Sequence, residues 1–285
     1  MRRLTLFASI LVLFAVAFAY ALPARADGVV VNTGNPDGKM ATASRPSSAG
    51  KLEIETADDF VLLQDTAITG GTFTGLIPLG ASLTDITSVT IEFYRVFPQD
   101  STVPPDSNVT TRVNSPADVE LNDRSSSDGS LTFSATLVQQ SFTANNSVLN
   151  GINKAPNQFT GGEGPVTGQE VMFSFSIDSD TLAANHYFFV PQVGLDTGDF
   201  FWLSAPKPIV PPGTPFPPGF TDLQTWIRNS DLDPDWSRVG TDITGQGPFN
   251  ASFSLEGESV PTPEPCTILL TGAGLLGLIL RRKIA

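Results

Sequence analysis

Stretches in which apolar and polar residues alternate recur along this chain, and none of its segments has convincing amphipathic-helix spacing. The clearest alternation runs over residues 86–97 and 170–177. Because successive side chains of a β-strand point to opposite faces of the sheet, each stretch predicts a strand with one face in the core. In residues 86–97 the expected inward residues are Val89, Ile91 and Phe93, with Arg95 next in the same set, unless the register turns the opposite face inward. In residues 170–177 they are Val171, Phe173, Phe175 and Ile177.

Shorter stretches of this kind bring the expected number of strands to about nine or ten, separated by segments rich in Gly, Pro, Ser and Asn. These stretches therefore predict an all-β fold for the body of the chain, a jelly-roll-like antiparallel β-sandwich over residues 27–257. A bulge is expected at Gly70-Gly71. Further strands are expected at residues 28–32, 51–55, 59–63, 67–76, 131–138, 186–193, 199–204 and 248–256, and loops at 32–50, 98–128, 145–168 and 206–218.

The net charge of the body limits the classes of molecule that it can bind. Residues 27–260 contain 28 acidic and 10 basic residues, a formal net charge of −18. Such a surface repels nucleic acid, so we expect no nucleic-acid partner. The single cysteine, Cys266, lies beyond this range, so the body has no disulfide and depends on its core.

The N-terminus has the three parts of a secretory signal peptide. Arg2 and Arg3 are followed by an apolar stretch over residues 4–20 and by Ala24-Arg25-Ala26, which matches an A-x-A cleavage site. We therefore expect a signal helix within residues 1–26, removed by signal peptidase to leave Asp27 first. An uncleaved membrane helix is the alternative.

The C-terminal segment, residues 258–285, predicts a short membrane anchor. Pro263-Glu264-Pro265 precedes residues 268–280, which are 13 uncharged residues, and the basic cluster Arg281, Arg282 and Lys283 follows. A helix of that length spans roughly 20 Å, less than the roughly 30 Å hydrocarbon core, so it crosses only with its flanks. The basic cluster favours the cytoplasmic side, which places the body outside. An ordinary C-terminal transmembrane tail is the alternative.

This tail resembles the PEP-CTERM sorting signal of Gram-negative bacteria, although Cys266 stands where Ser or Thr is more usual. The resemblance implies export, transient anchoring in the inner membrane, processing by an exosortase, and delivery to the cell surface or extracellular matrix. The body is similar, more loosely, to a sandwich domain recurrent in exported PEP-CTERM proteins, for which no activity carries over. That similarity involves Asp58-Asp59-Phe60, residues 86–97, Phe201-Trp202-Leu203-Ser204, Trp226 and Phe253-Ser254-Leu255.

Few residues offer catalytic chemistry. His186 is the sole histidine, and no G-x-S-x-G motif accompanies it, so we expect a structural role, exposed or hydrogen-bonded. The sequence Gly272-Ala273-Gly274-Leu275-Leu276-Gly277 matches a dinucleotide-binding pattern, but the chain ends too soon for the second strand that such a site needs. We therefore predict that the protein is not an enzyme.

The most specific metal-like feature is Asp231, Asp233 and Asp235, three carboxylates at alternate positions. Calcium prefers such oxygen ligands, and Asp222 or Asp242 would complete a site unlike an EF-hand. The alternative, which we favour, is a solvated turn in which the carboxylates cap backbone amides, so that no cofactor is bound.

Trp226 and Trp236 flank this acidic stretch in an expected loop. Exposed indole rings beside carboxylates suit stacking on sugar rings. We favour burial of both rings at the end of the sandwich, because tryptophan is usually buried. Together these patterns predict an exported, non-enzymatic cell-surface or exopolysaccharide-matrix protein. A carbohydrate-binding module, assisted by calcium, is the alternative, and a glycan-acting hydrolase ranks third.

The two end segments predict two cuts during maturation. Mass spectrometry of the cell-surface protein should find Asp27 as the first residue and no peptide from Leu269 onward. Peptides covering residues 269–280 in the mature protein would instead mean a permanent anchor.

Overall fold

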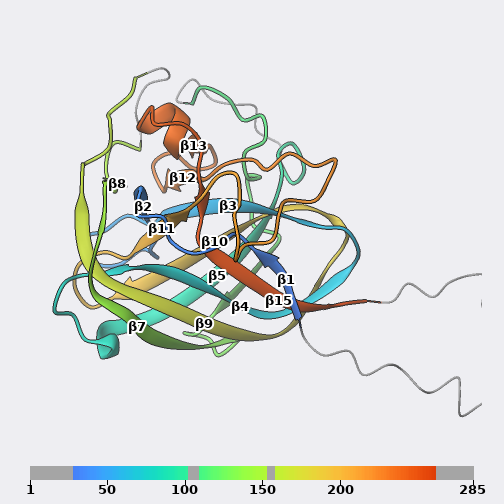
Figure 1. Ribbon diagram of the computed structural model, residues 1–285, viewed down its shortest axis with the longest axis horizontal. Coiled ribbons are helices and arrows are strands. Elements are labelled where there is room, and N and C mark those ends of the chain that lie inside the picture. The colour runs from blue at the N-terminus through green and yellow to red at the C-terminus, as the bar shows by residue number, and fades with distance from the viewer. Residues whose placement is uncertain (1–27, 102–108, 153–157, 261–285) are drawn as a thin grey trace, which may run out of the picture.

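The computed structural model describes residues 28–101, 109–152 and 158–260, which form an all-β molecule of two packed sheets (Figure 1). The expected signal helix, the sorting motif at 263–265, the membrane segment at 268–280 and the basic cluster at 281–283 lie outside these ranges. Within them, no helix has the length and apolar character needed to cross a bilayer.

The larger sheet has nine strands, and its longest antiparallel pairings join β7 to β9 and β9 to β4. β15 and β11 pair with β4. The only parallel pair among the described strands joins β2 to β8. The strands are β1 (Gly28–Asn32), β2 (Met40–Ala43), β4 (Thr66–Ile77), β7 (Leu131–Ala144), β8 (Asn146–Val148), β9 (Val166–Leu182), β11 (Phe201–Ala205), β14 (Asn250–Ala251) and β15 (Phe253–Ser259).

The smaller sheet is antiparallel and has six strands in the order β13-β12-β3-β10-β5-β6. They are β13 (Ser237–Arg238), β12 (Trp226–Asn229), β3 (Ile54–Leu62), β10 (Asn185–Leu195), β5 (Ile86–Arg95) and β6 (Asn122–Ser125). Two short helical turns accompany the sheets, the 3₁₀ turn η1 (Leu83–Asp85) and the π-helical turn η2 (Val239–Ile243).

Phenylalanine rings fill the space between the sheets. Phe73 and Phe173 stack with their ring centroids 4.9 Å apart, and Phe189 of the smaller sheet stacks on Phe175 of the larger one at 5.8 Å. The face expected to point inward on β9 is buried in this core, which confirms its prediction, and of the two faces left open for β5 the first lies in the core. These residues are Val89, Ile91 and Phe93 on β5, and Val171, Phe173, Phe175 and Ile177 on β9.

The glycine pair of β4 lets two neighbouring strands approach closely. A Cβ on Gly71 would lie 2.2 Å from the carbonyl oxygen of Ser254 and 3.0 Å from the ring of Phe175. The β4–β9 register shifts between Ile68 and Gly70, so the bulge expected at this pair is present.

The sequence misplaced several elements, one buried on both faces and the others very short. Residues 51–55 and 59–63 were expected to form two strands, but β3 is one strand in which every residue is buried. Its second face is covered by loops from residues 109–120 and 220–250, which form a further core around Tyr94, Trp226 and Trp236. The expected loops contain β2, β6 and β8, and β12, β13 and η2 were missed. β15 ends at Ser259, slightly beyond the expected boundary at 257.

Truncating the inward rings should unfold the sandwich most readily. Phe93→Ala and Phe173→Ala should each lower the free energy of unfolding by about 3–5 kcal/mol, because both rings are fully buried and leave a cavity. Phe159→Ala is a matched control: that ring is 64% exposed, and its loss should cost less than about 0.5 kcal/mol. Urea unfolding measures all three, and losses below about 1 kcal/mol at both core positions would contradict the assigned register.

Candidate functional site

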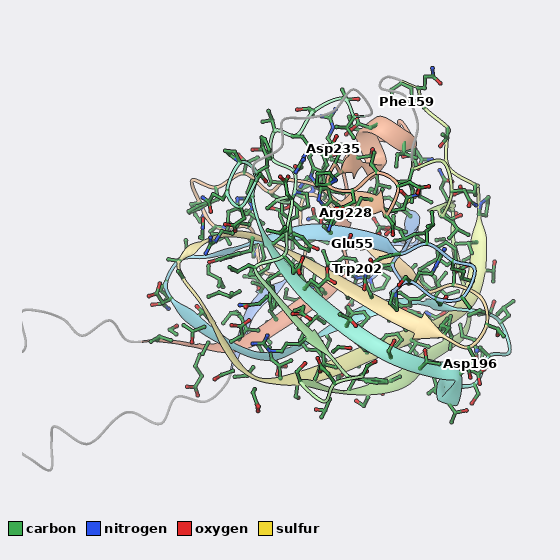
Figure 2. All side chains as sticks on the ribbon, turned by 180° about the vertical axis from the view of Figure 1, so that it is seen from behind. Glu55, Phe159, Asp196, Trp202, Arg228 and Asp235 are labelled. Carbon is green, nitrogen blue, oxygen red and sulfur yellow. The ribbon has the colours of Figure 1, made fainter. Side chains whose placement is uncertain are left out.

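A buried ion pair lies on the outer face of the smaller sheet. Arg228 of β12 stands directly opposite Glu55 of β3 in the strand register (Figure 2). Its Nε donates to Glu55 Oε2, and its Nη2 donates to Glu55 Oε1 at 3.0 Å. Both residues are at most 6% exposed, so this bidentate pair is shielded from solvent.

Two further groups from β5 join this pair. The hydroxyl of Tyr94 donates to Glu55 Oε1 at 2.7 Å and lies 3.0 Å from Glu92 Oε2, while Arg228 Nη2 donates to the same phenol oxygen at 3.0 Å. The indole ring of Trp236 covers the guanidinium, with 4.4 Å between the ring centroid and Arg228 Cζ. We call Glu55, Glu92, Tyr94, Arg228 and Trp236 the Arg228 cluster.

Burial determines the charges in the Arg228 cluster. It raises the pKa of Glu92 well above its ordinary value, and the negative charge of Glu55 raises that pKa further. Burial also raises the pKa of Tyr94 well above its usual range, with Glu55 and Glu92 contributing. Burial lowers the pKa of Arg228, but the adjacent Glu55 and Tyr94 outweigh it, so the guanidinium stays charged. Glu92 therefore holds its proton to higher pH than an exposed glutamate does.

The structure does not bring Asp231, Asp233 and Asp235 together. Asp231 is exposed on its turn, whereas Asp233 accepts from Arg228 Nη1 at 2.7 Å. Asp235 is buried and accepts from Nη1 of the buried Arg112 at 2.8 Å. Among the described residues, no group of three or more acidic, His or Cys side chains is placed to hold a metal ion.

The two tryptophans lie inside the molecule, as the favoured interpretation predicted. Trp226 begins β12 and is 1% exposed, and Trp236 precedes β13 and is 0% exposed. The indole of Trp236 donates to the carbonyl oxygen of Ala117 at 3.2 Å. Neither ring presents a face to solvent, so stacking on a sugar is not available to them in this structure. Their placement in a loop was wrong for Trp226.

His186 forms a hydrogen-bonded pair with a buried carboxylate, in keeping with its expected structural role. Its Nε2 lies 2.7 Å from Asp59 Oδ2, which also accepts from the backbone N–H of Leu223 at 3.0 Å. Burial raises the pKa of Asp59, and the hydrogen bond and charge of His186 act against that rise. Asp58, the neighbour of Asp59 on β3, points to the opposite face of that strand. Its Oδ2 accepts from the backbone N–H of Ala251 at 2.8 Å, which connects β3 to the larger sheet.

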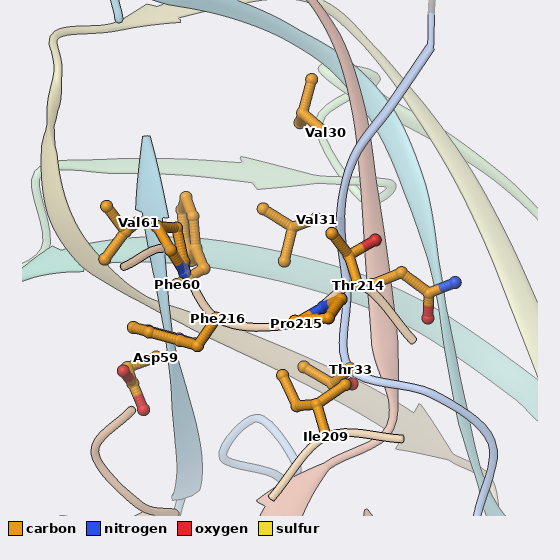
Figure 3. Close-up of a pocket in the computed structure, with 12 residues that line it drawn as sticks. Val30, Val31, Thr33, Asp59, Phe60, Val61, Ile209, Thr214, Pro215 and Phe216 are labelled. Atoms are coloured by element: carbon orange, nitrogen blue, oxygen red, sulfur yellow. The ribbon is translucent and has the colours of Figure 1, made fainter. Parts of the chain in front are cut away.

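The proline-rich segment 206–218, which we call the strap, covers a small cavity beside Asp59 (Figure 3). The cavity of about 50 Å³ lies between β1 and β3, and Phe216 and Ile209 of the strap line it. Thr214 N–H donates to the carbonyl oxygen of Asn32 at 2.8 Å, which fastens the strap to β1. This volume suits a few water molecules rather than an organic substrate.

A larger depression lies at the N-terminal end of β2, and we call it the Lys39 groove. Its volume is about 400 Å³. None of its lining residues is acidic. The sequence could not indicate this groove, because its residues come from four separated segments. The side chains that line it include Lys39, Met40, Asn145, Lys207, Gln246 and Phe249.

No protein-family model, no curated protein and no solved structure matches this chain.

The raised pKa of Glu92 makes stability depend on pH. Relative to the unfolded chain, whose glutamate keeps a pKa near 4.5, the folded state retains a proton at Glu92. The stability that the protonated Glu92 contributes is fully present below the pKa of the unfolded chain. It is lost as pH rises through the pKa of Glu92 in the folded state. Gln copies the protonated carboxyl and does not ionise. Glu92→Gln should therefore match wild type near pH 4 and become relatively more stable with rising pH, by at most about 1.4 kcal/mol per pH unit.

Urea unfolding at pH 4 and pH 8 measures this difference. Glu256→Gln, on an exposed position of β15, is the matched control and should follow wild type at both pH values. A stability difference between Glu92→Gln and wild type that stays constant with pH would contradict the assignment of the proton to Glu92.

Proposed function

We propose that this chain is an exported, non-enzymatic protein of the cell surface or exopolysaccharide matrix of a Gram-negative bacterium. The observation that carries the proposal is the C-terminal order of Pro263-Glu264-Pro265, an apolar segment and a basic cluster, together with the signal-like N-terminus. Signal peptidase and an exosortase would process the two ends, and the membrane would hold the tail transiently. We include in the proposal a helix at each end and a jelly-roll arrangement of the sandwich.

The side chains most suited to catalysis are engaged in structural contacts, which supports a non-enzymatic role. Glu55 is paired with Arg228, Asp235 with Arg112, and Asp59 with His186. The pairs of Glu55 and Asp59 each join two strands, and the pair of Asp235 joins two loops of the covering layer. A hydrolase would need a pair of carboxyl groups beside a cleft that admits a sugar. Glu55 and Glu92 share the phenol of Tyr94, but Trp236 and residues 109–120 cover them, so the hydrolase ranks last.

A carbohydrate-binding module is the second candidate. The specific observation in its favour is the Lys39 groove, whose volume of about 400 Å³ lies in the range of small-molecule sites. Lysine and amide side chains line it together with apolar ones. Assistance by calcium has no such support, because Asp233 and Asp235 are paired with different arginines.

A change in the sorting motif tests the main proposal. Pro263→Ala combined with Pro265→Ala keeps the apolar segment and the basic cluster but removes the Pro-Glu-Pro step. The variant should remain at full length in the inner-membrane fraction, whereas the wild-type protein should be shortened and reach the cell surface. A Pro261→Ala variant, changed just outside the motif, is the control and should behave as wild type. Equal shortening of all three proteins would show that the Pro-Glu-Pro step does not direct the cut, and a wild-type protein that stays at full length in the inner membrane would make the tail an ordinary anchor.

A further inference from the structure

We propose that the Lys39 groove binds a carboxylated sugar, with the Lys39 ammonium meeting the carboxylate. The proposal rests on the saccharide-binding candidate above and adds a site and a ligand class to it. Three properties of the groove carry it: an apolar floor, exposed amides, and one accessible positive charge.

The lining of the groove suits the two kinds of surface that a sugar ring presents. Met40 and Phe249 contribute apolar surface and are themselves 2% and 7% exposed, so they form a floor rather than a rim. Asn145 and Gln246 are exposed, and each amide supplies donors and an acceptor. A pyranose ring has apolar C–H faces and a rim of hydroxyl groups, which such a floor and such amides complement.

The two lysines of the groove differ in what they can offer a ligand. Lys207 Nζ donates to the carbonyl oxygen of Asp222 at 2.9 Å and to Asn250 Oδ1 at 3.2 Å, and it pairs with Asp222 Oδ1 at 2.5 Å. These contacts hold the ammonium group against Asp222 and Asn250. Lys207 therefore shapes the wall of the groove, and its charge is already paired.

Lys39 is placed to meet an anion. Its side chain is 68% exposed, and its ion pair with Asp37 Oδ2 is 3.2 Å long. The Asp37 side chain is only 9% exposed, so the pair stays in place, but it occupies only one of the three N–H donors of the ammonium group and leaves the others to meet a ligand. Asp37 itself stays in place, because its Oδ1 accepts from the hydroxyl of Ser204 and the backbone N–H of Lys39.

The choice of a sugar acid follows from size and charge together. A groove of about 400 Å³ exceeds what a bare phosphate or sulfate fills, and the apolar floor of Met40 and Phe249 would contribute nothing to such an ion. A neutral sugar would use the floor and the amides but not Lys39. Because the body carries a net charge of −18, an acidic sugar would be repelled over most of the surface. It would be repelled less at this groove, where no lining residue is acidic and the nearest carboxylates, Asp37 and Asp222, are each paired with a lysine.

Isothermal titration of the full-length protein in detergent tests the proposal, with trigalacturonate and the neutral galactose trimer of matched linkage as probes. Wild type should bind the acidic trimer more tightly than the neutral one. Lys39→Met should weaken the acidic trimer by about tenfold or more and leave the neutral one unchanged, because it removes one charge-assisted contact. Asn145→Ala should weaken both trimers. Lys51→Met is the matched control, since that lysine lies outside the groove beside Asp199, and it should bind as wild type.

Equal affinity for the two trimers, or equal losses in Lys39→Met and Lys51→Met, would overturn the role of Lys39. Binding that neither Lys39→Met nor Asn145→Ala weakens would overturn the groove as the site while leaving saccharide binding intact. No binding of either trimer at millimolar concentration would overturn both. The export and sorting proposal stands apart from these outcomes, because the Pro263→Ala, Pro265→Ala variant tests it.

Discussion

The ion pair between Arg228 and Glu55 allows loops to cover the outer face of the smaller sheet. Removing two charges from water is costly, and their attraction offsets that cost only when every remaining donor is satisfied. Here the guanidinium also donates to Asp233 Oδ1 and to the carbonyl oxygen of Asp118, so one arginine joins β3, β12 and the loop that follows residue 109. Trp236 then packs over a group that no longer needs water.

A second buried arginine, Arg112, is paired with carboxylates in the same way, within the loops that cover the smaller sheet. Arg112 is fully buried, donates to Asp235 and Asp118, and lies over the ring of Phe97. The covering layer is therefore held by directed polar contacts as well as by apolar packing, whereas the space between the sheets is almost entirely phenylalanine and aliphatic side chains. This division leaves the basic residues with few ligand-facing positions, which is why Lys39 stands out.

The core between the sheets and the covering layer also explain how much of the structure could be predicted from the sequence. Strands β5 and β9 have one face in the main core, so their period of two was visible and their inward residues were predicted correctly. β3 is covered on both faces and carries Glu55, Asp58 and Asp59 in its interior, so its polar residues resembled a break between two strands. β12 and β13 are only four and two residues long, too short for any period to show. The burial of Trp226 and Trp236 followed from residue type alone. Their partners, like the Lys39 groove, arise from segments far apart in the chain and left no local signal.

The strap has a consequence for the protein's behaviour at high concentration. β12 pairs with β3 only along Ile54–Ala57, so Asp59 to Val61 lie on an edge that another β-strand could extend. The strap lies against this edge, and its seven prolines have no backbone N–H to offer an incoming strand. Edge-to-edge growth into fibres is therefore blocked on this side. For a protein that we propose accumulates in a crowded matrix, that protection removes one route by which neighbouring molecules could join.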